Sequence, residues 1–342
     1  GLDKIFLRGV TPDNNVGVLP EYLYYLFMAL FAAITPPIIV GAFAERMRFP
    51  AVLVFLGVWF LIDYVPMAHM AWGGGWVAAW GAQDFAGGNV VHMNAGVAAL
   101  VASIMIGKRR GLGTVVMAPH DMTMTYTGGC MLFVGWLAFC GGCDYAVSGH
   151  AIELVINTML GGVGGALGWM IMEWMHRGRP STFGIVSGAI AGLVGITPAC
   201  GFVSPAGSIA VGILTSAACI WAVDNLKNIF GYDDAFDVFG IHGIGAMAGG
   251  LLTTVFAAPF LGGAGYSEGR DMLSQMGVQV FIMGFSILVS VVATFIAMKA
   301  AAMTGGVRVS EEVEESGLDL TCHGETAYRL STMTGDEESV YH

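Results

Sequence analysis

Two histidines, each preceded by an aspartate at the same distance, are the residues whose types and spacing suggest chemistry. Asp84 precedes His92 by eight residues, and Asp234 precedes His242 by eight residues. The two aspartate–histidine pairs lie 150 residues apart. A neutral imidazole can accept, donate and pass on a proton by changing its tautomer. Two such rings in contact could therefore line a path for a small hydrogen-bonding solute.

The composition places both pairs in a membrane. Apolar residues make up 56% of the 342 residues and charged residues only 11%, whereas about a quarter of a soluble domain is charged. Nine stretches are apolar enough and long enough to span a bilayer: about 21–43, 50–71, 87–107, 122–142, 152–175, 183–203, 207–226, 237–260 and 276–303. We therefore expect an all-α polytopic membrane protein with about nine transmembrane helices. The 51 glycines favour closely packed helices.

Basic residues indicate how these helices are oriented. They follow the first, third, fifth, seventh and ninth stretches, and the intervening loops carry only Arg270. The residues that form this pattern are Arg46, Arg48, Lys108, Arg109, Arg110, Arg177, Arg179, Lys227, Lys299 and Arg308. The positive-inside rule places these loops, and the C-terminus with them, in the cytoplasm. The sequence predicts a multi-pass protein of the plasma or inner membrane.

The net charge of −11 is concentrated at the C-terminal end. Residues 304–342 contain nine acidic and two basic side chains. No basic patch is present to neutralise phosphates, which excludes a nucleic-acid partner. We predict a transmembrane transporter domain over residues 1–303 and a cytoplasmic acidic tail over 304–342. Residues 309–328 are expected to contact the cytoplasmic loops and 329–342 to be solvated and flexible.

The orientation of the two histidine helices indicates an internal repeat. The third stretch enters the membrane from outside and the eighth from inside, so the two helices run antiparallel, as in an inverted-topology repeat. We predict a partial first repeat over 21–107, a second repeat over 122–260 and a last helix over 276–303. The second histidine helix closes a set of five stretches and the first closes a set of three. This difference, with a chain that opens on Gly1, predicts that about two helices are missing from the amino end.

The spacing also predicts the depth of the histidines. Eight residues of helix rise about 12 Å, so each histidine should lie near the middle of a hydrocarbon core about 30 Å thick. An intramembrane histidine marks a functional site facing a cavity by default; a packing histidine bonded to a carbonyl and a haem ligand are the alternatives. Asp84 and Asp234 are expected to cap the two helices. For Asp84 we expect an additional role, because it would lie on the external side near a cation entrance.

Aromatic residues form the second pattern. Phe27 and Phe31 are one helical turn apart, and so are Trp136 and Phe139. Packing alone commonly explains such pairs. Trp72 differs because it precedes three glycines at the external end of the second stretch. It fits either an interfacial aromatic belt or a face that recruits a small cation.

Together these motifs resemble those of the ammonium transporter (Amt/MEP/Rh) family over about residues 27–328. The matching segments are Ala-Glu-Arg-Met-Arg-Phe (44–49), His-Met-Ala-Trp-Gly-Gly-Gly (69–75), Asp-Phe-Ala-Gly-Gly-Asn-Val-Val-His-Met-Asn-Ala (84–95), Thr-Pro-Ala-Cys-Gly (197–201), Asp-Val-Phe-Gly-Ile-His-Gly (237–243) and Gly-Leu-Asp…His-Gly-Glu-Thr-Ala-Tyr (317–328). The resemblance implies eleven helices, a 5+5 inverted repeat plus a last helix, in a homotrimer with one pore per subunit. By that pattern the first two helices are absent here. Trp72 favours the Amt branch over Rh-type proteins.

The resemblance also implies roles for individual residues at the outer end of a pore. Trp72 and Phe31 resemble the aromatic faces of an outer ammonium site. Cys143 takes the place of a serine in many members, and a thiol is a poorer hydrogen-bond acceptor than a hydroxyl. Asp84 takes the place of the supporting acid near the entrance.

Deeper in the pore, Phe31 and Phe139 resemble a paired phenyl gate, and Phe27 is assigned to the same pore lining. His92 and His242 resemble the pore histidine pair. Trp136 takes the place of a tryptophan that lines the upper pore.

The function implied is ammonium and ammonia transport, with methylammonium as an analogue substrate and without cofactor, metal or enzymatic activity. Ammonium would be recruited outside, deprotonated, and conducted as ammonia past the phenylalanines along the histidines. The pore residues assigned here include no mid-span carboxylate to offset the cost of an ion. An alternative is a non-conducting ammonium sensor that signals through its tail, and a third reading is a haem-containing redox enzyme. The resemblance further implies a PII-type signal protein at the cytoplasmic face.

Overall fold

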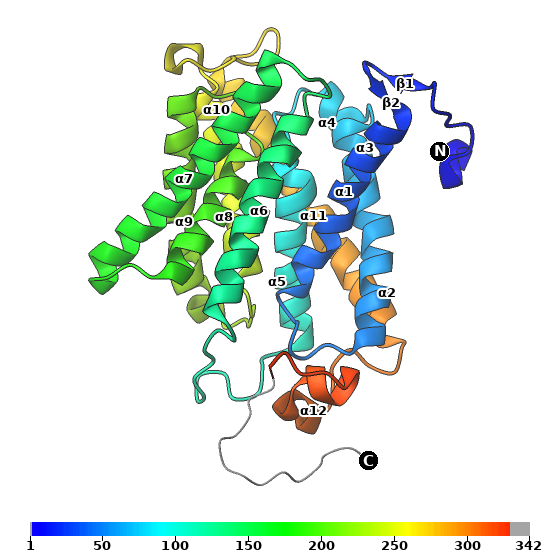
Figure 1. Cartoon of the computed structure of the whole chain (residues 1–342), viewed down its shortest axis with the longest axis vertical. Helices are drawn as coiled ribbons and strands as arrows, with labels where there is room; N and C mark the ends of the chain where they lie inside the picture. The colour runs from blue at the N-terminus through cyan, green and yellow to red at the C-terminus, as the bar shows by residue number, and fades with distance from the viewer. Residues whose placement is uncertain (1, 329–342) are drawn as a thin grey trace.

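The computed structural model describes residues 2–328 and is almost entirely helical (Figure 1). Its long helices are α1 (Glu21–Val40), α2 (Phe49–Trp59), α3 (Val65–Trp72), α5 (Asn94–Ile106), α6 (Met122–Gly142), α7 (Gly149–Arg177), α8 (Thr182–Ile196), α9 (Pro205–Phe230), α10 (Ile244–Phe256) and α11 (Met272–Ala302). Its shorter elements are η1 (Leu2–Leu7), β1 (Asn15–Val16), β2 (Leu19–Pro20), η2 (Phe60–Tyr64), α4 (Trp76–Ala79), η3 (Gly88–Met93), η4 (Phe239–Gly243), η5 (Pro259–Leu261), α12 (Glu311–Ser316) and η6 (Asp319–His323). Strands β1 and β2 form a small antiparallel hairpin before α1.

The expected polytopic helical fold is confirmed. Within the described residues, eight helical segments are long and apolar enough to cross a membrane, and α8 is a shorter apolar helix in the remaining position. Two boundaries were wrong. The second segment continues beyond residue 71 to Ala79, and α8 stops at Ile196 instead of near 203, because Pro198 lacks the backbone N–H that a continuing helix requires.

Polar side chains define where the long helices begin. In five of them the residue before the first turn accepts a hydrogen bond from a backbone N–H of that turn: Asp121, Ser148, Ser181, Ser204 and Asp271. These N–H groups have no partner inside the helix. Caps at these positions satisfy them where the chain enters a medium that offers little water.

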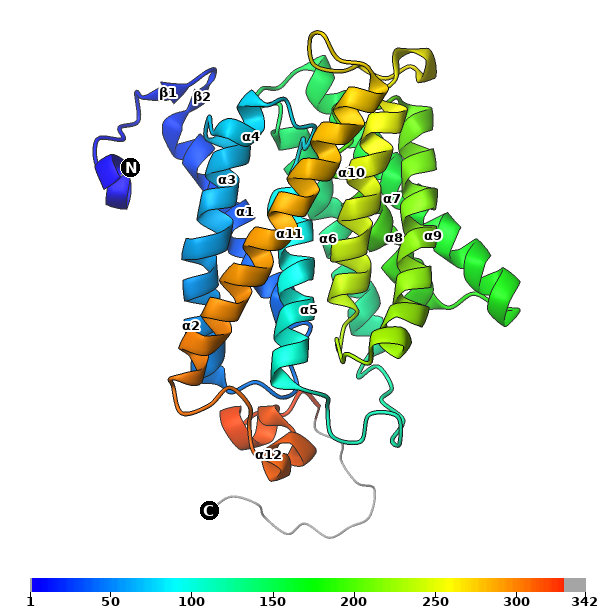
Figure 2. The same ribbon diagram turned by 180° about the vertical axis from the view of Figure 1, so that it is seen from behind.

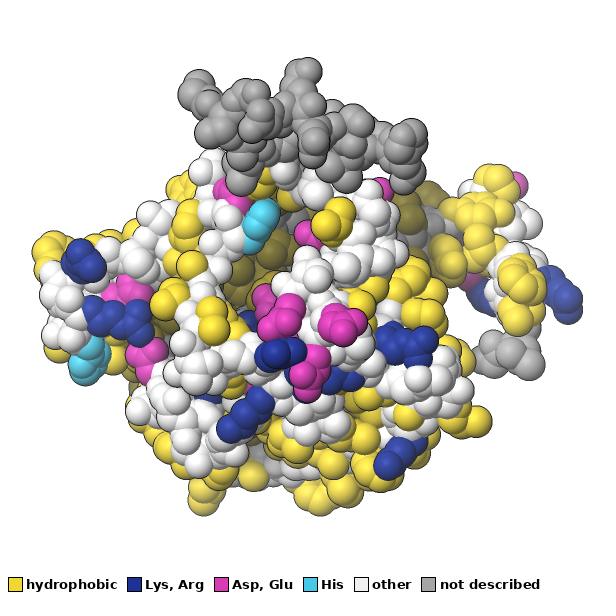
Figure 3. Space-filling model, turned by 90° about the horizontal axis from the view of Figure 1, so that it is seen from below, with side chains coloured by type: hydrophobic (Ala, Val, Ile, Leu, Met, Phe, Trp, Pro, Cys, Tyr) yellow, Lys and Arg dark blue, Asp and Glu magenta, His cyan; other side chains and the backbone are white. Residues whose placement is uncertain are grey.

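The loops that carry the basic residues meet on one face, as the charge pattern predicted (Figure 3). Arg46 is fully buried there and its guanidinium donates to the carbonyl of Gly107, just after α5, at 3.0 Å and to that of Asp233, just before η4 and α10, at 2.5 Å. Arg177, at the end of α7, pairs with Asp224 near the end of α9 at 2.8 Å. Arg46 thus contacts the chain just after α5 ends and shortly before η4 and α10 begin. The two histidine helices therefore run antiparallel (Figures 1 and 2).

The segment after α11 packs against this basic face, where α12 lies beneath α2 and α5 (Figures 1 and 2). Arg308 binds Glu314 at 2.8 Å, and Arg110 binds Glu311 at 2.9 Å and Glu315 at 3.1 Å. Tyr328 donates a hydrogen bond to Asp121. The predicted contact of residues 309–328 with the loops is therefore present. The flexible, solvated end expected for 329–342 lies outside the described residues.

The close crossing of α5 with η4 depends on glycine. A Cβ atom at Gly96 would lie 2.2 Å from the backbone nitrogen of Gly243 and 2.4 Å from its Cα. Membrane helices approach this closely only through small residues. The crossing joins the two halves of the predicted repeat close to the histidines: Gly96 lies four residues after His92, and Gly243 directly follows His242.

Replacing Gly96 with alanine should push α5 and η4 apart at this crossing. The expected cost is about 1–3 kcal/mol of unfolding free energy from overpacking, seen as a lowered melting temperature of the detergent-purified protein. Gly284→Ala is the matched control, since a Cβ at Gly284 meets nothing within 4 Å and alanine favours a helix over glycine by about 1 kcal/mol. Equal melting temperatures for the two variants would contradict the close crossing.

Because of Asp233, the free energy of unfolding should decrease at acid pH. Burial alone would raise its pKa, but hydrogen bonds from Arg109 and the charges of Arg109 and Arg46 outweigh burial and hold the pKa below its ordinary value of 3.8. The stabilisation is therefore present above the unfolded-state pKa and is lost as the pH falls through the lower folded-state pKa. Asp233→Asn should cost about 3 kcal/mol at neutral pH, and the difference from wild type should shrink on acidification.

The control for this prediction is Glu45→Gln. Glu45 also pairs with Arg109, at 3.3 Å, but its side chain is 52% exposed, so its removal should cost less than about 1 kcal/mol. Melting temperatures across an acid pH series measure both variants. A constant difference between wild type and Asp233→Asn across the series would refute the role of the carboxylate charge.

Candidate functional site

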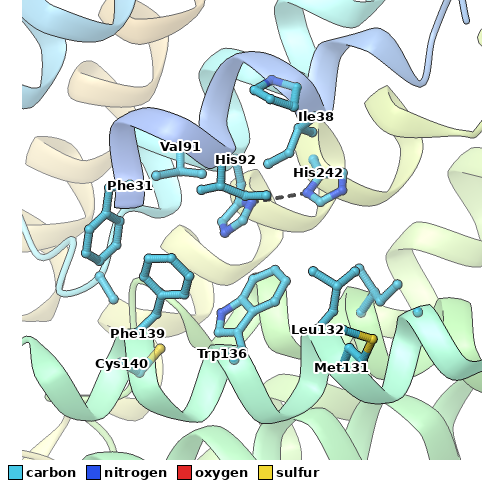
Figure 4. A pocket seen from close by; sticks show the side chains of 16 residues that line it. Phe31, Ile38, Val91, His92, Met131, Leu132, Trp136, Phe139, Cys140 and His242 are labelled. Carbon is cyan, nitrogen blue, oxygen red and sulfur yellow. Dashed lines mark hydrogen bonds between the residues drawn. The ribbon is translucent and has the colours of Figure 1, made fainter. Parts of the chain in front are cut away.

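A cavity of about 590 Å³ lies between α1, α6 and the two histidine helices (Figure 4). Its wall is mostly aliphatic and aromatic and is formed by Phe31, Ile34, Pro37, Ile38, Ala86, Val91, His92, Gly128, Met131, Leu132, Gly135, Trp136, Phe139, Cys140, Ile190 and His242. Five of the residues selected from the sequence are in this wall. The two imidazoles are its titratable nitrogen groups, so a solute that enters meets hydrogen-bonding groups chiefly there.

The two histidine rings are joined by a hydrogen bond between their Nδ1 atoms at 3.1 Å (Figure 4). The ring planes differ by 21°. His92 is 5% exposed and His242 is half-buried. Residues 150 positions apart in the chain are thus in contact through their side chains.

This hydrogen bond restricts the tautomers of the neutral pair. One ring must carry its proton on Nδ1 and the other must accept there, so the accepting ring carries its proton on Nε2. The pair therefore offers one Nε2 lone pair and one Nε2–H group. Such a pair can both accept from and donate to a small solute such as water or an amine.

Each histidine lies in a π-helical turn, a feature absent from the sequence interpretation. His92 lies in η3 and His242 in η4, each at the start of a membrane helix. In η3 the N–H of His92 bonds to the carbonyl of Gly87, five residues earlier. Such turns are rare and frequently occur at functional sites. No propensity rule identifies them in a single sequence.

Trp136 holds the ring of His92. The indole and the imidazole are stacked, with centroids 4.9 Å apart and planes 16° apart. The indole Nε1–H donates to Thr197 Oγ1 at 2.7 Å, and Thr197 in turn donates to the carbonyl of Leu193. Thr197 was quoted in a motif but received no role, and helical spacing alone could not place it against α6.

The phenylalanine rings close the upper part of the cavity. Phe31 and Phe139 meet edge to face with centroids 4.7 Å apart. Phe27 packs on Phe31 at 5.2 Å and lies 6.4 Å from Phe139. Phe31 is only 4% exposed. The predicted aromatic residues of α1 and α6 therefore do come together, although the sequence placed them on separate helices.

Trp72 lies beside this phenylalanine pair. Its ring centroid is 5.3 Å from that of Phe31, and it is half-buried. Gly87 permits this position: its φ angle is +103°, and a Cβ atom there would lie 3.0 Å from the indole. Cys143 packs against the same cluster, where its thiol donates to the carbonyl of Phe139 at 3.3 Å. Because the thiol hydrogen is used in this bond, Cys143 can offer a solute in the cluster only the lone pairs of its sulfur.

The helix that follows Asp84 starts later than predicted. The first helical residue is Gly88, so only four residues of helix, and not eight, precede His92. The carboxylate instead accepts from the backbone N–H groups of Gly87 at 3.2 Å, Gly88 at 2.5 Å and Asn89 at 2.9 Å. The capping role is confirmed in this form.

Asp234 behaves in the same way at the other helix. Its carboxylate accepts from the N–H of Phe239 at 2.7 Å, and η4 begins at Phe239. A short non-helical segment thus separates each aspartate from its histidine helix. The repeated spacing is real, but its meaning as eight residues of helix was wrong.

The remaining wall residues were missed in the sequence. Ile34 and Ile38 follow Phe31 at helical spacing, and Leu132 precedes Trp136 by one turn. A helical-face argument from Phe31 and Trp136 could have found them. Because the two Nδ1 atoms bond to each other at 3.1 Å, these two nitrogens cannot both ligate one iron.

Comparison with known proteins identifies a family to which the chain is similar. A family model described as "Ammonium Transporter Family" matches residues 5–328. The ammonium transporter of Bacillus subtilis (strain 168) is 44% identical over 335 residues, which cover 97% of this chain and 82% of that protein. The ammonium transporter of Aquifex aeolicus (strain VF5) is 42% identical over 94% of this chain and 75% of its own length.

Solved structures show the same similarity. The crystal structure of Candida albicans Mep2 superposes with a TM-score of 0.83 at 35% identity and covers 91% of this chain and 71% of that one. A structure described as "Sensor Amt Protein" has a TM-score of 0.82 at 26% identity and covers 90% and 79%. The predicted fold thus has solved counterparts over most of its length.

Proposed function

The chain belongs to the ammonium transporter family, and from this premise we propose that it carries ammonium nitrogen across a membrane as ammonia along the histidine-lined cavity. The observation that carries the proposal is the hydrogen bond between His92 and His242 at 3.1 Å in the wall of an otherwise largely apolar cavity. Ammonia is both a hydrogen-bond donor and an acceptor. The neutral histidine pair offers the matching acceptor and donor.

Recruitment takes place at the outer aromatic cluster. The faces of Trp72 and Phe31 lie next to each other, with centroids 5.3 Å apart. Each face contributes about 0.5–2 kcal/mol to holding a small cation, and Cys143 supplies a weak acceptor from its sulfur lone pairs. Asp84 lies below this cluster and is occupied by three backbone N–H groups, so its role is to support the entrance.

Deprotonation precedes passage through the phenylalanine pair. The rings of Phe31 and Phe139 meet edge to face with their centroids 4.7 Å apart. Moving a bare ammonium ion into the apolar cavity beyond them would cost far more than the outer site contributes. Ammonia pays no such charge penalty. The proton stays behind at the entrance or crosses separately.

Selectivity follows from the same chemistry. Potassium has a similar charge but no proton to lose, so it remains on the outer side of the phenylalanine rings. A tight cage of oxygen atoms is not needed to reject it. Trp136, fixed by its hydrogen bond to Thr197, keeps the His92 ring aligned along the path.

Replacing both His92 and His242 with leucine should abolish ammonium-selective transport. The cavity would keep a similar volume, because leucine is close to histidine in size, but it would lose the groups that bind ammonia. Radiotracer methylammonium uptake into vesicles reconstituted with the purified variant measures the effect. We expect a loss of at least tenfold, with the melting temperature as the check on folding.

His150→Leu is the matched control, because His150 is an exposed histidine at the start of α7 that contacts Glu153. Its uptake should equal that of wild type. A folded His92→Leu/His242→Leu protein that keeps its selective uptake would refute the proposed path.

Trp72→Leu should weaken apparent ammonium affinity without closing the path. Loss of one cation–π face of about 0.5–2 kcal/mol corresponds to a roughly 2- to 30-fold higher half-saturation concentration. Cys143→Ser should lower the half-saturation concentration, since a hydroxyl accepts hydrogen bonds better than a thiol. Competition of ammonium with methylammonium uptake gives both values.

The control for Trp72 is Trp76→Leu. Trp76 is 40% exposed and packs on Phe285 of α11 at 5.0 Å, away from the cavity. Its affinity should stay at the wild-type value. If Trp72→Leu and Cys143→Ser both leave the half-saturation concentration unchanged, the outer site lies elsewhere.

A non-conducting ammonium sensor is the second candidate. The similarity to the structure described as "Sensor Amt Protein" favours it, as does the packing of the C-terminal segment on the loops. The vesicle experiment separates the two functions. Uptake by the wild-type protein supports transport, and binding of ammonium without uptake supports the sensor.

The assembly and location of the protein remain predictions. They comprise a homotrimer with one pore per subunit, the plasma or inner membrane, and a cytoplasmic basic face with the acidic tail. The same holds for a PII-type signal protein at that face. The ion pairs of Arg110 and Arg308 with α12 support a role for α12 in such an interface.

A further inference from the structure

A third π-helical turn in the membrane-spanning part carries a titratable side chain that the proposed transport path does not use. The turn is η2, within the membrane segment Phe49–Ala79, and the side chain is Asp63. Asp63 is fully buried, and neither carboxyl oxygen has a hydrogen-bond partner. It is absent from the cavity wall. The two other π-turns within the spans carry the histidines.

The surroundings of Asp63 offer acceptors and no free donor. Turn η2 packs against α11, which carries Ser290 as the hydrogen-bonding side chain closest in effect to the carboxyl group, and no hydrogen bond joins the two side chains in the structure. Ser290 has one hydroxyl proton, and it donates this proton to the backbone carbonyl of Asn94 at 2.8 Å. It therefore presents lone pairs to Asp63. An ionised carboxylate would face an acceptor, whereas a neutral carboxylic acid would supply the missing donor.

No opposite charge compensates an ionised Asp63. The elements packed against η2 are α1, α2, α3 and α11, and their titratable or charged side chains are Glu21, Tyr22, Tyr24, Tyr25, His69 and Lys299, with Tyr64 in η2 itself. Glu21 pairs with Lys4, and the Lys299 ammonium lies over the Phe295 ring. The Tyr64 ring stacks on Phe60. None of these groups acts on Asp63 through its charge, and an unpaired charge inside a membrane is costly.

We propose that Asp63 is a proton-binding site inside the membrane: it holds a proton at neutral pH, and Ser290 Oγ is the acceptor available to that proton once the carboxyl group turns toward it. The hydrogen bonds then run from Asp63 to Ser290 and from Ser290 to the carbonyl of Asn94. This chain links the helical segment that carries Trp72 to α11 and to the residue two positions after His92. The site lies outside the cavity and takes a proton, not ammonium.

Loss of this proton would reverse the hydrogen bond between Asp63 and Ser290, so that Ser290 becomes the donor. An ionised Asp63 would take the hydroxyl proton of Ser290 as its donor, and the carbonyl of Asn94 would lose its side-chain partner. The proposal thus makes the link between the second span and the histidine helix sensitive to alkaline pH. It does not depend on whether the protein conducts ammonia.

Infrared spectroscopy of the purified protein in vesicles tests the proton directly. Wild type should show the carbonyl stretch of a protonated carboxyl group at neutral pH, shifted in heavy water and lost in Asp63→Asn. In Ser290→Ala the band should remain but move to higher frequency, because its hydrogen-bond acceptor is gone. Glu268→Gln, at an exposed loop position, should leave the band unchanged. A wild-type spectrum identical to that of Asp63→Asn at neutral pH would overturn the proposal.

Thermal unfolding is the second readout and does not require the band to be resolved. A proton bound in the folded state but released on unfolding makes stability fall as the pH rises above the ordinary aspartate pKa. The melting temperature of wild type should therefore fall relative to Asp63→Asn as the pH increases. A difference that stays constant, or that changes in the opposite direction, would overturn the proposal.

Discussion

The hydrogen bond between His92 and His242 is the interaction on which the rest of the structure depends. It forms only if two antiparallel helices cross within backbone contact, and Gly96 provides that contact against Gly243. It also requires both rings to face one cavity, which the π-helical turns at the start of each helix achieve. Because the rings bond to each other, each is left with one nitrogen for a solute. The geometry thus converts two ordinary imidazoles into a paired donor and acceptor.

The surrounding elements act to keep polar groups satisfied in a medium without water. The carboxylates of Asp84 and Asp234 accept from the N–H groups that open the two helices. Trp136 bonds to Thr197, which bonds to its own helix. Buried polar groups without partners cost several kcal/mol in such surroundings, so each of these bonds also fixes a position. Asp63 departs from this pattern as a buried carboxyl group with neither oxygen paired, and the proposed proton would give it a donor.

The face that carries the basic loops is a second point of rigidity. Arg46 is fully buried and joins the end of one histidine helix to the start of the other. Arg109 and Asp233 add a charged pair at 2.9 Å, and the segment around α12 covers the neighbouring loops through Arg110 and Arg308. The two helices that position the imidazoles are thus tied together at the basic face as well as at their glycine crossing. The segment around α12 also contacts α5 directly, because Arg308 donates to the carbonyl of Ile106 at 3.3 Å.

The sequence by itself determined the helical membrane fold, which loops share one face of the molecule and which two histidines meet. Hydropathy, loop charge and an exact internal spacing are properties of the chain read in order. Tertiary structure alone decided which aromatic rings meet and that Thr197 supports Trp136, since these contacts join helices far apart in the chain. It also moved the helix starts away from Asp84 and Asp234, because both carboxylates reach their backbone partners across a non-helical segment. The isolation of Asp63 was decided in the same way: whether a buried carboxyl has a partner depends on the neighbouring helix, which hydropathy cannot identify.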